Sequence, residues 1–136
     1  MLELTEAARV TAGIVLLTVV AIEAGGAFMV RVVTGAVPTT DLQRRFFRAG
    51  HAHAGVLVIL GLLCLLLGEA TDLTGFWRWI AQTGVLVAAI LMPAGFFLSV
   101  LGVGRARPSR WVVLLPAGGV FLTAGVLTLG VGLLRV

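Results

Sequence analysis

The two histidines of the chain, His51 and His53, stand one residue apart at the start of a long apolar run. Imidazole is rare in such runs and usually has a function there, as a metal ligand or as a proton carrier. Small residues surround the pair and leave room for a bulky ligand or for the close approach of another helix; these are Ala49, Gly50, Ala52, Ala54 and Gly55. The simpler alternative is a hydrogen bond from each imidazole to a carbonyl group or a lipid phosphate.

The spacing of the histidines limits how they can work together. Residues two apart on a helix point about 200° away from each other, so they do not bind one ion as an i, i+4 pair does. Only locally unwound backbone would let His51 and His53 chelate a single ion. Because residues 54–67 are strongly apolar, we expect a helix, with the two rings serving different sites or different faces.

Glu23 is a third candidate, because a carboxylate inside an apolar helix normally faces a partner. It precedes Arg31 by eight residues, which is about 12 Å along a helix and about the depth of His53. We therefore expect His53 to point inward, toward Glu23, with His51 pointing toward a subunit interface, a second cofactor or headgroups. Glu23 would orient the imidazole, carry protons or bind metal itself; alternatively, it is a protonated acid bonded to a backbone carbonyl.

Other side chains suit the same chemistry. Met92 and Met29 are possible soft ligands for haem iron or copper, although packing is the commoner role of methionine. Arg48 belongs to a cluster with Arg44 and Arg45, which would anchor the chain to anionic lipid or pair with haem propionates or a quinone headgroup. Cys64 is expected to be a packing residue.

Composition decides the protein class. Of the 136 residues 60% are hydrophobic and 12% are charged, and the mean hydropathy is +1.12. A soluble domain is typically about 25% charged, so we expect an integral membrane protein with about four spanning helices. Neither a nucleic-acid-binding pattern nor a phosphate loop, protease motif or nucleophile–base pair is present in the sequence.

The apolar runs and their boundaries predict one all-α, four-helix transmembrane bundle that covers residues 1–136. The expected helices are 10–33, 42–68, 77–104 and 111–134. Thr40 or Asp41 is a plausible N-cap for the second helix, and Pro93 should kink the third. Interhelical contacts should use small residues, namely Ala21 with Gly25, Gly84 with Ala88, Gly119 with Thr123, and Thr128 with Gly132.

Arginine distribution predicts the topology. The first and third loops carry Arg44, Arg45, Arg48, Arg105, Arg107 and Arg110. The positive-inside rule places these loops in the cytoplasm and both termini outside, in the plasma membrane or the inner membrane of a bacterium. The acidic start of the chain does not match a cleavable signal peptide, so we expect the first helix to be retained.

The stretch Arg48–Gly55, RAGHAHAG, and the apolar helix after it resemble histidine motifs of the haem-copper oxidase and nitric oxide reductase superfamily. They also resemble small four-helix bacterial membrane proteins often labelled as oxidase-like. In that superfamily an H-x-H pair on one helix sends each histidine to a different haem. For this chain the resemblance implies haem or metal ligation at His51 and His53 and nothing more. The chain has too few helices and no further histidines for a copper centre, so oxygen reduction by this chain alone is not expected.

Three classes of function follow. The first is a membrane protein that binds haem, copper or zinc for electron transfer or sensing, with His51, His53 and Arg48 around the cofactor and His51, His53, Glu23 and Met92 as metal ligands. The second is a proton or ion pathway through Glu23 and the histidines. The third is a structural or accessory subunit of a larger membrane complex. The small size of the bundle also makes homo-oligomers plausible, and the residues do not decide whether the chain is an enzyme.

Overall fold

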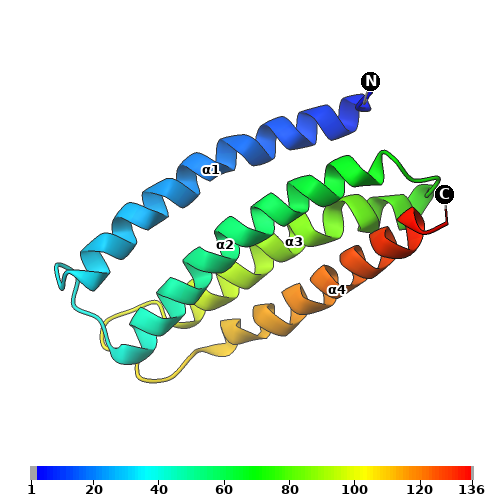
Figure 1. Cartoon of the computed structure of the whole chain (residues 1–136). Helices are drawn as coiled ribbons and strands as arrows, with labels where there is room; N and C mark the ends of the chain where they lie inside the picture. The colour runs from blue at the N-terminus through cyan, green and yellow to red at the C-terminus, as the bar shows by residue number, and fades with distance from the viewer. Residues whose placement is uncertain (1–2, 136) are drawn as a thin grey trace.

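Four long helices and one short 3₁₀ turn make up the chain in the computed structural model, which describes residues 3–135 (Figure 1). The elements follow in the order α1 (Glu6–Val33), α2 (Asp41–Gly68), α3 (Gly75–Ser99), η1 (Arg110–Val113) and α4 (Leu114–Leu133). The described residues contain no strand, which confirms the all-α prediction.

Each helix is long and apolar enough to cross a membrane. The candidate spans have 28, 28, 25 and 24 residues, the last counting η1 together with α4. At about 1.5 Å per residue each exceeds the roughly 30 Å of a bilayer's hydrocarbon core. The helix content is therefore that of a multi-pass membrane protein.

Local sequence explains where the first two helices begin. The hydroxyl of Thr5 accepts a hydrogen bond from the N–H of Ala8, so α1 starts at Glu6, earlier than predicted. Thr40 caps α2 in a reciprocal arrangement with Gln43, because the side-chain oxygen of each residue accepts a hydrogen bond from the backbone N–H of the other. The predicted cap at Thr40 is confirmed.

The ends of the third and fourth helices differ from the prediction. α3 ends at Ser99, not 104, and Gly102 and Gly104 adopt positive φ angles of 112° and 64°, which break a helix. The fourth helix opens with the 3₁₀ turn η1. Pro116 explains this tighter start, since it has no N–H to donate and its ring crowds the carbonyl four residues earlier.

The bundle core lies among α2, α3 and α4. Its buried residues are Leu57, Cys64, Ala81, Val85, Ala88 and Leu129, which confirms Cys64 as a packing residue. A β-carbon on Gly84 would lie 3.0 Å from the Cα of Gly125, so α3 and α4 touch backbone to backbone here. The contact predicted at Gly119 and Thr123 is wrong: a β-carbon on Gly119 would meet no atom of another helix within 4 Å, and Thr123 is exposed.

Helix α1 lies outside this core, along α2 (Figure 1). Near its C-terminal end, Met29 and Val32 pack with Phe47 and Val100. Near its N-terminal end Ala8 is buried, and α1 has no buried residue between Ala8 and Met29. The helix is thus held at its two ends and is loosely packed in between.

The antiparallel helices put the α1–α2 and α3–α4 loops at one end of the molecule and the two termini with the α2–α3 loop at the other (Figure 1). The loop arginines of the sequence pattern therefore lie together at one end.

Candidate functional site

The histidine motif lies within a regular stretch of α2, which runs unbroken from Asp41 to Gly68. Gly50 faces α3 so closely that a β-carbon there would lie 2.9 Å from the ring of Phe97 and 3.0 Å from Cβ of Phe96. This contact fixes the rotation of α2 about its axis. His51 and His53 consequently lie on opposite flanks of the face that α2 presents to α3.

His51 is the histidine that faces α1. Its ring lies against two glycines: a β-carbon on Gly25 would lie 3.4 Å from Nδ1, and one on Gly26 would lie 3.5 Å from Nε2. Within residues 3–135 neither ring nitrogen has a hydrogen-bond partner. The expectation that His53 would be the inward residue toward α1 is wrong, because helical phase, not depth, decides which ring meets α1.

His53 faces α3 instead. Its ring lies on that of Phe96, with 4.9 Å between the centroids. Its Nδ1 lies 2.7 Å from the carbonyl oxygen of Ala49, one turn back in α2. An N–H at Nδ1 would donate to this carbonyl, which leaves Nε2 as the free nitrogen.

A cavity of about 390 Å³ opens between α1 and the α2–α3 pair, with His51 as its titratable side chain. The rest of its lining is nearly all apolar: Ile14, Val15, Thr18, Ala21, Ile22, Gly25, Ala54, Val58, Leu86, Ala89, Ile90 and Phe97. Ligand pockets commonly measure about 300–1,000 Å³ and combine apolar walls with a few polar groups. We call this space the His51 cavity.

Two predicted ligands lie elsewhere. Glu23 is exposed, and among the described residues it has no hydrogen bond or ion pair. The α1 face toward α2 carries Gly25, Gly26 and Met29, and Glu23 lies off this face, so its expected support of an imidazole is not formed. Met92 packs against the bundle core and close to α4, where a β-carbon on Gly118 would lie 2.4 Å from its Cγ, and it does not line the His51 cavity.

Arg48 lies near His51, since both line a second cavity of about 380 Å³ together with Met29. In contrast, the described residues contain no group of three or more His, Cys, Asp or Glu side chains placed to hold one metal ion. Because the two histidines face different helices, they do not form a shared metal site in this structure.

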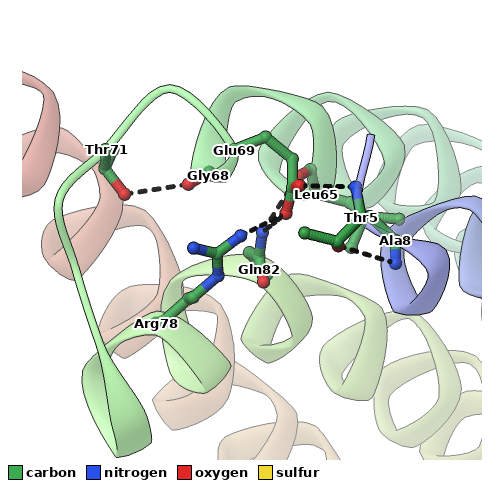
Figure 2. Close-up of polar contacts among 8 residues, drawn as sticks. All are labelled: Thr5, Ala8, Leu65, Gly68, Glu69, Thr71, Arg78 and Gln82. Atoms are coloured by element: carbon green, nitrogen blue, oxygen red, sulfur yellow. Dashed lines mark hydrogen bonds and ion pairs between the residues drawn. The ribbon is translucent and has the colours of Figure 1, made fainter. Parts of the chain in front are cut away.

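One polar cluster was not anticipated from the sequence (Figure 2). The carboxylate of Glu69, whose side chain is 5% exposed, accepts hydrogen bonds from the Thr5 N–H at 2.9 Å, from Arg78 at 2.7 Å and from Gln82 at 2.5 Å. Burial raises the pKa of Glu69, but the hydrogen bonds from Thr5, Gln82 and Arg78 outweigh it and lower the pKa to about 2. The cluster connects the start of α1 to α2 and α3. No local sequence pattern indicates it, because Thr5 and Glu69 lie 64 residues apart in the chain.

Comparison with protein-family models, curated proteins and solved structures finds no match to this chain. The histidine motif thus stands as a short resemblance, and the functional assignment depends on the surroundings of His51.

Proposed function

We propose that this chain is a plasma-membrane protein that binds a hydrophobic cofactor of the haem class in the His51 cavity, where the imidazole of His51 would hold the iron. Haem would supply one-electron chemistry there, for electron transfer or sensing. The chain's own part is to offer an imidazole nitrogen, to surround the macrocycle with apolar side chains and to limit the access of water.

The observation that carries this proposal is the unpartnered ring of His51 at the edge of an apolar cavity. A neutral imidazole with a free nitrogen is the commonest protein ligand of haem iron. Apolar walls match the macrocycle, and the loosely packed middle of α1 provides lateral entry from the bilayer. His53 suits this role less well, because its ring packs on Phe96 of α3 and does not line the His51 cavity.

Of the cofactors expected from the sequence, which were haem, copper and zinc, the proposal takes haem. Transition metals held by side chains need several ligands in fixed geometry, whereas haem brings four nitrogens and needs one or two from the protein. A single free imidazole in an apolar space therefore favours haem over a bare ion.

Haem titration into the detergent-purified protein tests the proposal. We expect saturable binding with a stoichiometry of one haem per chain and a sharpened, shifted Soret band, with reduced and oxidised forms that interconvert. A broad Soret band that grows without saturation, as for haem dissolved in empty micelles, would contradict the proposal. Metal analysis of the same sample would reveal copper or zinc if either is the resident ion.

A further inference from the structure

Three arginines gather at the corner where α1 ends and α2 begins. Arg44, Arg45 and Arg48 line a cavity of about 330 Å³ together with Asp41, Val32 and Val33. Asp41 pairs with Arg44. Among residues 3–135 neither Arg45 nor Arg48 has a carboxylate partner, so the corner keeps an excess of positive charge.

An apolar space continues from this corner. The 380 Å³ cavity shares Arg48 and Val33 with the arginine cavity and extends past Met29 and Val30. Val30 is 62% exposed and Val33 is 68% exposed, so they form an open apolar strip on α1. Positive charge and apolar surface thus meet at Arg48.

We propose that this corner is a binding site for an anionic phospholipid, with its phosphate between Arg45 and Arg48 and one acyl chain along Val30 and Val33. Guanidinium groups bind phosphate oxygens in bidentate fashion, and two unneutralised arginines favour a headgroup with net negative charge over a zwitterionic one. The occupant is taken to be a bilayer lipid, because the apolar strip that adjoins the charges suits a chain and a free anion would leave it uncovered. Arg45, Arg48, Val30 and Val33 do not line the His51 cavity, although His51 also lines the 380 Å³ space. The inference does not depend on haem binding.

The test uses the full chain in vesicles of equal parts phosphatidylglycerol and phosphatidylcholine, followed by native mass spectrometry of the lipids retained. The test variant is Arg45→Gln with Arg48→Gln. Its matched control is Arg107→Gln with Arg110→Gln, which removes two exposed arginines from the same end of the molecule but not from this cavity. A third protein, Arg45→Lys with Arg48→Lys, keeps the charge.

We expect the wild type and the control to retain phosphatidylglycerol in preference to phosphatidylcholine. A surface arginine contributes about fivefold to anionic-lipid affinity, so the Gln pair should lose roughly 25-fold and the Lys pair should keep most of the preference. Equal retention of both lipids by the wild type, or an equal loss in the Arg107 and Arg110 control, would overturn the proposal. Displacement of the lipid by millimolar inorganic phosphate would also overturn it, because it would indicate a site for free anions.

Discussion

The ring of His51 lies against Gly25 of α1, where a β-carbon would come within 3.4 Å of Nδ1. This contact sets His51 apart from His53, whose ring packs on Phe96 of α3. A β-carbon at residue 25 would make an ordinary contact with the ring, whereas a longer side chain would enter the space around the imidazole.

Replacing Gly25 with leucine should fill part of the His51 cavity, because residue 25 is one of its lining residues. We expect haem affinity to fall by at least about tenfold, as losses around a ligating histidine commonly do. Gly13→Leu is the matched control on the same helix, since a β-carbon on Gly13 would meet no atom of another helix within 4 Å. Both variants would be titrated with haem, and equal affinities would show that the cavity is not the cofactor site.

Glu69→Gln should destabilise the protein, because the amide replaces a nearly buried carboxylate that accepts three hydrogen bonds. A hydrogen bond to a charged group contributes about 1.5–3 kcal/mol, so we expect a loss of about 2 kcal/mol in the free energy of unfolding. Asp72 is an exposed residue of the same loop, so Asp72→Asn should change the free energy of unfolding little. Denaturant unfolding in detergent measures the free energy of unfolding of both variants. A similar loss in the two would contradict the stabilising role of the Glu69 hydrogen bonds.

The same carboxylate predicts a dependence of stability on pH. The pKa of Glu69 is lowered from 4.5 to about 2, so the unfolded chain binds more protons than the folded chain between these values. Its stabilising contribution is complete above about pH 4.5 and is lost as the pH falls toward 2. Melting temperature should therefore drop more in the wild type than in Glu69→Gln across this range, and parallel curves would contradict the prediction.

Gly84→Val should disrupt the packing of α3 on α4, since even a β-carbon would lie 3.0 Å from the Phe121 carbonyl oxygen and the Gly125 Cα. Overpacking of this kind costs about 1–3 kcal/mol. Gly119→Val on α4 adds the same side chain where no atom lies within 4 Å, so its melting temperature should stay near that of the wild type. Equal melting temperatures of Gly84→Val and Gly119→Val would contradict the prediction.

Topology is tested with single cysteines in a Cys64→Ala background. We expect a cysteine at position 107 to resist a membrane-impermeant thiol reagent added outside intact cells, because the arginine-rich loops should face the cytoplasm. A cysteine at position 72, in the α2–α3 loop at the other end of the molecule, should react. The reverse pattern of labelling would show that the arginine-rich loops face the outside of the cell, which would contradict the predicted topology.

Hydropathy and caps were enough to predict four helices and the start of α2, because apolar length and the Thr40 cap are local properties. Helix rotation was not predictable in this way. Which histidine meets α1 depends on Gly50 fitting against Phe96 and Phe97, a contact between residues far apart in sequence. Depth along the helices suggested that His53 would meet Glu23. Instead His51 faces α1, and Glu23 lies off the α1 face that carries Gly25, Gly26 and Met29.

Haem binding by His51→Ala and His53→Ala, measured side by side in the Soret region, tests the central claim most directly. We expect His51→Ala to lose the shifted Soret band and to bind haem at least about tenfold more weakly. His53→Ala should keep the band, because its ring faces α3 and does not line the His51 cavity. Loss of the band in His53→Ala with an unchanged band in His51→Ala would contradict the assignment of His51 as the ligand.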